Sequence, residues 1–390
     1  MNDFIFQNTT KVYFGKDQMQ YLSGEIGRYG NKVLLVYGGG SIKHIGLYEK
    51  ILNLLYANGM EVVEFSGVEP NPRHTTVNKG AAFCRQEKVD VILAVGGGSV
   101  IDCCKGIAAT AVAATDDVWD FVEGKEMVQR ALPLIAIPTI AASGSEVNAG
   151  GVISNLDKKI KRAVKSPLLC PYATFADPTN TFSVSPYQTA CGSLDIMSHV
   201  FDSAYFSKQE QMDMILNMQE TLFRTVIRYA PIAMREPDNY EARANLMWAS
   251  MWVMNGFLDS GVRQANACHI MEHELSAYYD LNHGQGMAII LPKWLHYILD
   301  EITAIRIYRL GKECFGISAD LGDIQGAEET IEALSDFCYE TLGLKSHLMD
   351  CDMGDEYFEK MAAHACENGP INSFKPLHKE DVVAIFRECL

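Results

Sequence analysis

The sequence lacks long apolar runs and clusters of basic residues. No stretch reaches the roughly 18 consecutive apolar residues that a membrane span needs, and the start, Met1-Asn2-Asp3-Phe4, has no basic or apolar region typical of a signal peptide. The 33 lysines and arginines are outnumbered by 49 acidic residues, for a net charge of -16, which opposes binding to phosphate backbones or anionic lipid. We therefore expect a cytoplasmic protein that binds neither nucleic acid nor membranes.

Paired cysteines and linker-like segments are also missing. The 11 cysteines are an odd number and none form a C-x-x-C pair, which favours reduced thiols in a chain too long to need disulfides. There is no internal repeat, low-complexity stretch or proline-rich linker. With 390 residues and 48% apolar content, the chain is long enough for two packed domains.

The first half of the chain alternates short apolar runs with helical patterns, which is typical of βαβ units and a parallel sheet. Helices are expected over 42–57 and 73–86, and strands over 33–37, 61–65, 89–95 and 132–137. The fold class predicted for this half is α/β with a Rossmann-like sheet.

The second half shows almost no strand signal after about residue 180, and apolar residues recur at helical spacing nearly to the C-terminus. Ser185-Pro186-Tyr187-Gln188 is a helix start, because serine can cap, proline suits the first helical position and glutamine can complete a capping box. We expect a dinucleotide-binding α/β domain over 1–184 and an all-helical metal-binding domain over 185–390.

Two glycine clusters each follow a predicted strand and precede a predicted helix: Gly38-Gly39-Gly40-Ser41 and Gly96-Gly97-Gly98-Ser99. Bare backbone amides in such turns can approach a phosphate. The hydroxyl-rich segment 138–146 follows the fourth strand at the same predicted edge. Neither cluster is the G-x-G-x-x-G fingerprint, but two in equivalent positions favour a dinucleotide site over ordinary tight turns.

The residue after the first strand indicates which dinucleotide is preferred. An acidic residue there would accept hydrogen bonds from the adenosine ribose and repel a 2'-phosphate, whereas this chain has Gly38. With Ser41 as a hydroxyl donor and Lys43 as a nearby cation, we expect NADP(H) to be preferred over NAD(H).

Acidic and histidine side chains recur at the spacing of metal ligands. Asp195 and His199 lie four residues apart on one predicted helix, and His269 and His273 repeat this relation on a later one, with His283 ten residues further on. A carboxylate with three imidazoles leaves coordination positions open and suits Fe(II) or Zn(II) better than Mg(II) or Ca(II). Spacing alone does not decide which of the four histidines are ligands.

The motifs taken together resemble one enzyme family over almost the whole chain. They are Val12-Tyr13-Phe14-Gly15, Tyr37 to Ser41, Glu69-Pro70-Asn71-Pro72, Gly96 to Asp102, Thr139 to Glu146, Asp177-Pro178, the Asp195/His199 pair, Cys268 to Leu275 and His283-Gly284. On these residues the sequence resembles the iron-containing (group III) alcohol dehydrogenases, in particular their NADPH-dependent butanol dehydrogenase and aldehyde reductase branch. The resemblance implies a dehydroquinate synthase-like architecture and a homodimer.

The resemblance also implies roles for individual residues. The metal ligands would be Asp195, His199, His269 and His283, with iron or zinc as the ion, and His273 would relay a proton. Asp102 and Asn148 join His273 as candidate catalytic residues. The cofactor contacts implied by the resemblance or by the turns above are Gly38, Gly39, Gly40, Ser41, Lys43, Asn71, Gly96, Gly97, Gly98, Ser99, Asp102, Thr139, Ser143 and Lys161.

Two positions depart from the family's pattern. Asp202 stands where the family commonly has glutamate, and Glu272 is an additional acid beside the histidines. The expected reaction is the interconversion of aldehydes and primary alcohols such as butanal and butanol. Dehydrogenation of polyols or lactaldehyde by the same family, a non-redox lyase of the dehydroquinate synthase type, and a binding protein without chemistry are the alternatives.

Overall fold

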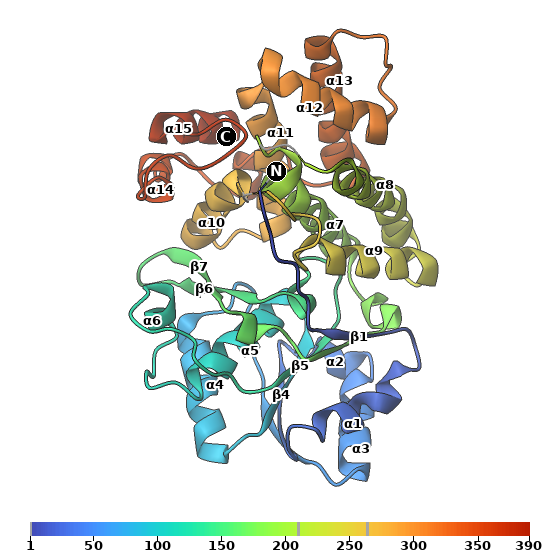
Figure 1. Ribbon diagram of the computed structural model, residues 1–390, viewed down its shortest axis with the longest axis vertical. Coiled ribbons are helices and arrows are strands. Elements are labelled where there is room, and N and C mark those ends of the chain that lie inside the picture. The colour runs from blue at the N-terminus through green and yellow to red at the C-terminus, as the bar shows by residue number, and fades with distance from the viewer. Residues whose placement is uncertain (1, 209–210, 263–264) are drawn as a thin grey trace. The chain divides into compact units, whose positions relative to one another are not determined.

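The computed structural model describes residues 2–208, 211–262 and 265–390, and the chain divides into two compact units (Figure 1). The α/β unit comprises Gln7–Val184 and Pro237–Asn255, and the helical unit comprises Met1–Phe6, Ser185–Glu236 and Gly256–Leu390. The units are therefore not continuous along the chain, unlike the domains expected from the sequence. Assignment of cofactor and metal binding to 1–184 and 185–390 remains a prediction.

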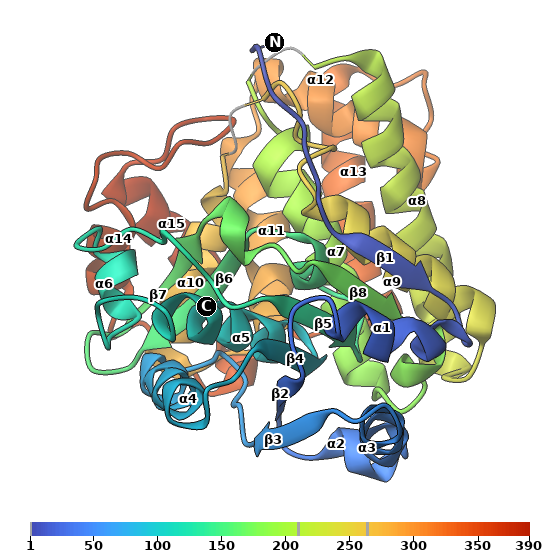
Figure 2. The ribbon, with the colours of Figure 1, turned by 60° about the horizontal axis from the view of Figure 1, so that its bottom comes forward.

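The α/β unit contains a six-stranded sheet in the order β1-β8-β5-β4-β2-β3 (Figure 2). Every neighbouring pair is parallel. The strands are β1 (Lys11–Phe14), β2 (Lys32–Tyr37), β3 (Glu61–Phe65), β4 (Val91–Gly96), β5 (Leu134–Pro138) and β8 (Ala173–Ala176). The four strands predicted from apolar runs are confirmed, whereas β1 and β8 are additional.

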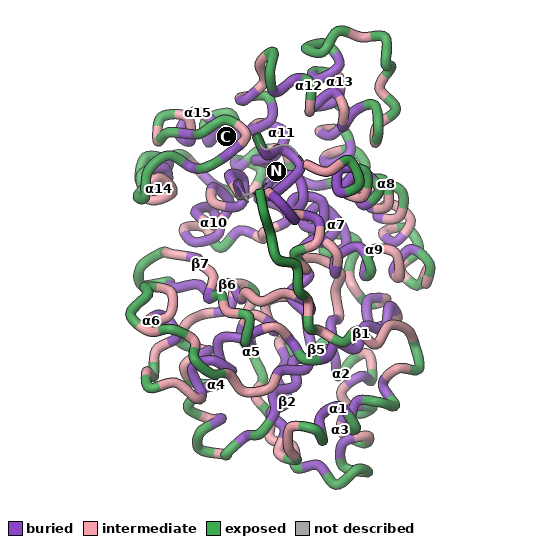
Figure 3. Tube along the Cα trace, viewed as in Figure 1, coloured by how far each residue is buried: buried purple, intermediate pink, exposed green. Residues whose placement is uncertain are grey.

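Alternate residues of the sheet face two separate cores. Leu34 and Ile92 pack with one core, which also includes residues of α4 (His74–Glu87) and α5 (Gly98–Thr110). Their neighbours Val33 and Val91 pack with the other core, which includes residues of α1 (Leu22–Ile26) and α3 (Leu47–Ala57). Helices cover both faces, so nearly every residue of these central strands is buried, as the burial colouring of the trace shows for β2 and β5 (Figure 3). Burial on both faces explains why β2, β4 and β5 are continuous apolar runs in the sequence.

The prediction of a single helix over 42–57 is wrong in one respect, because the structure has two helices there. Helix α2 covers Ser41–His44 and α3 begins at Leu47. Gly46, between them, has a φ of +73°, a left-handed conformation that glycine adopts without steric cost and that ends a right-handed helix.

An antiparallel hairpin of β6 (Gly150–Asn155) and β7 (Ile160–Lys165) follows β5 in the chain. The backbone N–H of Ser154 donates to the carbonyl of Pro72 at 2.8 Å, and α6 (Trp119–Val122) packs near β7. Helix α9 (Tyr240–Val253) completes the α/β unit.

The described residues of the helical unit form no strand, as the sequence predicts for the chain beyond about residue 180. Ser185 accepts a hydrogen bond from the backbone N–H of Gln188 at 3.2 Å, so the predicted helix start is confirmed. The helices are α7 (Pro186–Val200), α8 (Asp213–Arg235), α10 (Ala267–Tyr279), α11 (His283–Ile298), α12 (Glu301–Leu310), α13 (Asp323–Asp336), α14 (Phe358–Ala365) and α15 (Lys379–Glu388). None of the helices in the described ranges is long and apolar enough to cross a membrane.

Candidate metal and cofactor sites

Helix α7 places Asp195 and His199 one turn apart on its buried face. Both residues are more than nine-tenths buried, and a carboxylate oxygen of Asp195 lies 3.1 Å from Nδ1 of His199. The start of this helix is fixed by Ser185, which caps it, and by Pro186 in its first turn. Asp195 and His199, which are four residues apart in the sequence, therefore lie side by side inside the helical unit.

His269 and His283 reach the same point from two other helices. His269 lies in the first turn of α10, and His283 begins α11. The break between these helices is built by Asp280, which ends α10 with a φ of +56°, and by Asn282, whose side chain accepts from the backbone N–H of Gln285. Nε2 of His283 lies 3.3 Å from a carboxylate oxygen of Asp195.

The rings of His199, His269 and His283 form a triangle. Their centroids are 4.7, 5.3 and 6.3 Å apart. His273 is adjacent to one corner, with its ring centroid 5.9 Å from that of His283. Asp195, His199 and His269 form one compact group, while His283 contacts Asp195 and also groups with Glu272 and His273, so the choice of ligands among the four histidines remains a prediction.

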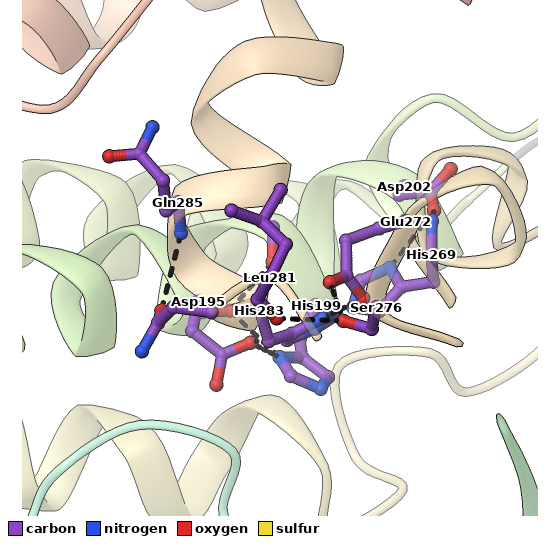
Figure 4. A network of polar contacts seen from close by, with 11 residues as sticks. Asp195, His199, Asp202, His269, Glu272, Ser276, Leu281, His283 and Gln285 are labelled. Carbon is purple, nitrogen blue, oxygen red and sulfur yellow. Dashed lines mark hydrogen bonds and ion pairs between the residues drawn. The ribbon is translucent and has the colours of Figure 1, made fainter. Parts of the chain in front are cut away.

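Oxygen atoms orient each of these three imidazoles through Nδ1 (Figure 4). The carboxylate of Asp202 lies 3.0 Å from Nδ1 of His269, and the backbone carbonyl of Asp195 lies 2.7 Å from Nδ1 of His199. Nδ1 of His283 forms a short hydrogen bond with Glu272, which also accepts from the hydroxyl of Ser276. Such contacts leave Nε2 for a metal and fix the ring direction.

Asp202 and Glu272, the two departures from the family's pattern, thus have a structural place. Both are fully buried, and each holds one imidazole through Nδ1. Asp202 lies in the π-helix at Phe201–Tyr205 that follows α7, and it also accepts from the backbone N–H of His269 at 2.9 Å. The sequence had not indicated that these acids orient the candidate ligands.

The donor set fits a divalent cation. Among the described residues, Nε2 of His269 is buried and has no hydrogen-bond partner, a costly state for a polar atom without a ligand. Asp195, His199 and His269 each offer one donor atom, and these three atoms lie within 4.8 Å of one another. Two donors bound to the same iron or zinc ion can be roughly 4 Å apart, so this spacing is close to that of a metal site.

Protonation in the cluster follows from burial and from these neighbours. Burial opposes ionisation of Asp195, yet His199 and His283 hold the pKa of its carboxyl well below the usual range. Burial lowers the pKa of His269 and so favours the neutral imidazole that ligates metals. For His283, burial is outweighed by Glu272 and Asp195, which raise its pKa to about 9.

The two glycine clusters of the α/β unit lie at adjacent strand ends. Strand β2 leads into Gly38 and β4 ends at Gly96, and these strands pair directly, with Tyr37 opposite Val95. The sheet order reverses here, because β3 lies beyond β2 while β5 lies beyond β4. Ligands of open α/β sheets bind at the carboxyl ends of strands where the order reverses.

The segment after β5 contacts the second glycine cluster. The backbone N–H of Thr139 donates to the carbonyl of Gly96 at 3.0 Å. A Cβ added to Gly98 would lie 2.5 Å from the hydroxyl of Ser143, and one added to Gly97 would lie 2.8 Å from Ile140. The structure thus brings together Gly96 to Ser99, Thr139 and Ser143, and glycine is required for their close approach.

Other predicted cofactor residues lie in separate parts of the α/β unit. The Lys43 ammonium lies 5.2 Å from the ring centroid of Tyr37 and 4.5 Å from that of Tyr48. Asn71 has a φ of +50° in the loop before α4. Lys161, on β7, is buried, and its charge opposes the effect of burial, which raises the pKa of Asp102.

Asp102 and Asn148, predicted as catalytic, belong to a polar network inside the α/β unit. The Asp102 carboxylate accepts from the hydroxyl of Ser145 and from the backbone N–H of Val152. Asn148 accepts from the ammonium of Lys105 at 2.7 Å. Sequence reasoning missed Lys105, although a cation inside the apolar segment 100–111 is an available signal.

Comparison with known proteins gives a consistent result over nearly the whole chain. The family model described as iron-containing alcohol dehydrogenase matches residues 9–178, and the model of the C-terminal part of the Fe-containing alcohol dehydrogenase family matches residues 189–390. NADH-dependent butanol dehydrogenase B of Clostridium acetobutylicum is 43% identical, and the match covers 100% of both chains.

Two further relatives agree with this assignment. The NADPH-dependent aldehyde reductase YqhD of Escherichia coli is 36% identical over 90% of this chain and 89% of its own length. The crystal structure of NADH-dependent butanol dehydrogenase A from Thermotoga maritima superposes with a TM-score of 0.94 at 34% identity, covering 100% of this chain and 99% of the other. The chain therefore belongs to the iron-containing alcohol dehydrogenase family.

Proposed function

We propose that this chain is a metal-dependent oxidoreductase that interconverts aldehydes and primary alcohols with a nicotinamide cofactor. The observation that carries the proposal is the convergence of Asp195, His199, His269 and His283 from three helices, with Nε2 of His269 buried and unpartnered among the described residues. Relatives named as butanol dehydrogenase and aldehyde reductase support the same reaction class.

A divalent cation, when bound, would polarise a carbonyl, and a reduced nicotinamide would supply hydride. Asp195 and the three imidazoles would hold the cation, while Asp202 and Glu272 hold Nδ1 of His269 and His283 and so would orient these rings as ligands. Fe(II) and Zn(II) both suit this set of nitrogen and oxygen donors.

His273 is the residue proposed to move a proton to or from the substrate oxygen. It lies on α10 one turn after His269, and it is only partly buried. An imidazole changes protonation near neutral pH, which suits it to this transfer. Asp202 and Glu272, by contrast, are fully buried and already hold other imidazoles.

We propose NADP(H) as the preferred cofactor, bound at the carboxyl ends of β2, β4 and β5. Ser41 and Lys43 support this choice, because a hydroxyl and a cation after Gly38 favour a 2'-phosphate. NAD(H) is the second candidate: the Glu64 carboxylate accepts from the hydroxyls of Tyr37 and Tyr48 beside Lys43, and the relative at 43% identity is named NADH-dependent.

The experiment is a substrate panel followed by nicotinamide absorbance. The purified protein, loaded with Fe(II) or Zn(II), is assayed with aldehydes of increasing chain length, with lactaldehyde and with diols, using NADPH and NADH in parallel. We expect stoichiometric oxidation of cofactor with butanal-like aldehydes and a higher kcat/KM for NADPH. A tenfold preference for NADH would overturn the cofactor choice, and product formation without net cofactor oxidation would favour a lyase instead.

A further inference from the structure

A lysine ammonium is completely buried inside the α/β unit. Lys105 lies on α5, seven residues after the helix begins at Gly98, and it is 0% exposed. Its ammonium donates to the hydroxyl of Ser145 at 2.8 Å, to Oδ1 of Asn148 at 2.7 Å and to the carbonyl of Gly150 at 2.7 Å. An ammonium has three donors, so all three are used, and all three acceptors lie in one short segment.

Ser145 extends these contacts to Asp102. Its hydroxyl accepts from Lys105 and donates to Oδ1 of Asp102 at 2.5 Å, while Oδ2 of Asp102 accepts from the backbone N–H of Val152 at 3.0 Å. The network therefore ties α5 to the segment 145–150 and to β6. The two α5 residues in this network, Asp102 and Lys105, are close in sequence to the glycine cluster at which the helix begins.

The charge balance shows why an ammonium is tolerated at this position. Burial lowers the pKa of Lys105 to about 8, against the attraction of Asp102 and Glu146, which raise it. A buried charge is costly unless it is paired and hydrogen-bonded. Removing only the ammonium would take one donor from each of the oxygens of Ser145, Asn148 and Gly150, and Asn148 would keep only the backbone N–H of Gly150, so these acceptors would have to move or admit water.

The network packs closely against the segment that carries predicted cofactor contacts. A Cβ on Gly151 would lie 3.0 Å from the backbone oxygen of Asp102 and 3.2 Å from Cβ of Lys105. At the other end of the stretch, the hydroxyl of Ser143 would lie 2.5 Å from a Cβ added to Gly98, the first residue of α5. The stretch from Ser143 to Gly151 is thus held against α5 at both ends, and Lys105 is the central attachment.

We propose that Lys105 is a positioning residue for the nicotinamide cofactor: its ammonium locks the segment 139–150 against α5 so that Thr139, Ser143 and Asp102 are held in the binding geometry. The inference rests on the proposed cofactor site at this sheet edge. Lys105 itself does not touch the cofactor, because it is buried beneath the segment that it holds.

The test compares Lys105→Met with Lys293→Met. Lys293 is a matched control in the helical unit, where its ammonium donates to the hydroxyl of Tyr339 and the carbonyl of Ser346, both at 2.8 Å. Cofactor dissociation constants are measured for NADPH and NADH by fluorescence titration, together with bound metal and thermal midpoints. We expect Lys105→Met to raise both dissociation constants at least tenfold with metal content unchanged, and Lys293→Met to lower the thermal midpoint without changing them.

Unchanged cofactor affinity in Lys105→Met would overturn the proposal. If that variant does not fold, Lys105→Gln and Ser145→Ala serve instead, since the amide retains two donors and the alanine removes the hydroxyl that accepts from Lys105 and donates to Asp102. Each is expected to raise the dissociation constants by severalfold, and wild-type values in both would equally overturn the proposal. Absence of nicotinamide binding by the wild-type protein would instead contradict the proposed function.

Discussion

Individual side chains in the candidate metal site hold each imidazole at Nδ1, while Nε2 of His269 has no hydrogen-bond partner among the described residues and Nε2 of His283 faces Asp195. Asp202, Glu272 and the backbone carbonyl of Asp195 take the Nδ1 atoms of His269, His283 and His199. Such partners set the tautomer and ring direction before any ion arrives. The candidate ligands are therefore preorganised by residues that do not themselves ligate.

Replacing Glu272 by glutamine tests this orientation. The glutamine amide cannot hold Nδ1 of His283 as a carboxylate does, and loss of such a partner typically weakens metal binding by about 10- to 100-fold. We expect this loss in competition titrations with a chelator. Glu274→Gln is the matched control, because Glu274 pairs with His364 instead; equal affinity in Glu272→Gln and wild type would contradict the assigned orientation.

Replacing His273 by alanine separates proton transfer from metal binding. The variant should retain wild-type metal content, because Asp195 and three other histidines remain. Positioned general acids contribute roughly 10²- to 10⁴-fold to a rate, and since water can substitute in part, kcat should fall by about 10- to 100-fold with a changed pH-rate profile. An unchanged profile would show that His273 moves no proton.

Glu146 makes the stability of the α/β unit depend on pH. Burial raises the pKa of its carboxyl from 4.5 to about 7, against the opposing effect of Lys105. Because the folded-state pKa is raised, the stabilising contribution is complete below about pH 4.5 and is lost as the pH rises through 7. At pH 8 the buried carboxylate therefore costs stability.

Replacing Glu146 by glutamine should remove this pH dependence. Relative to wild type, the free energy of unfolding of Glu146→Gln should increase between pH 5 and pH 8 by roughly 1 to 3 kcal/mol, from about 1.4 kcal/mol for each unit of pKa. Urea denaturation at both pH values measures the difference. A difference between variant and wild type that is the same at pH 5 and pH 8 would contradict the raised pKa.

At the scale of helices and strands, glycine sets how closely the elements approach. A Cβ on Gly284, in the first turn of α11, would lie 2.2 Å from the backbone oxygen of Cys191 on α7. Backbone atoms cannot move aside as a flexible side chain can, so the two helices that carry His283 and Asp195 depend on this position. Close packing of α11 against α7 therefore explains why glycine follows His283.

Gly284→Ala is expected to push α11 away from α7. Overpacking of this kind costs typically about 1 to 3 kcal/mol, and metal content per chain should fall because His283 and Asp195 separate. Gly322→Ala is the control, since its added Cβ meets nothing within 4 Å. Metal analysis and thermal unfolding give the outcome, and full occupancy with an unchanged midpoint in Gly284→Ala would contradict the account.

The elements also show how far the sequence predicts the structure. Apolar runs and glycine turns predict β2 to β5, and Ser185 predicts the start of α7. The short strands β1 and β8 lie outside these runs, and the break at Gly46 needs a backbone conformation that periodicity does not report. Pairing of β2 with β4, which places the two glycine clusters side by side, follows from strand order and not from local sequence.

The candidate site was predictable to a similar degree. Helical spacing indicates that Asp195 and His199 share a face, but it cannot show that His283 meets them while His273 lies to one side. The network around Lys105 was not predicted, because its acceptors come from a segment about 40 residues further along the chain. Tertiary pairing of this kind leaves no local periodic pattern.

At the scale of the whole molecule, the chain combines a cofactor-binding type of sheet with a helical unit that carries a metal-binding type of cluster. Family membership supports this combination over residues 9–178 and 189–390. A homodimer and a cytoplasmic location remain predictions. The proposed chemistry depends on a bound cation, and the buried Nε2 of His269, which has no hydrogen-bond partner among the described residues, supports its presence.

The most direct measurement is turnover before and after metal removal. Chelation of the wild-type protein should abolish aldehyde-dependent oxidation of NADPH or NADH, and one equivalent of Fe(II) or Zn(II) per chain should restore it. His269→Ala should bind metal poorly and stay inactive after the same addition. Full turnover by protein shown to contain no metal would contradict the central claim.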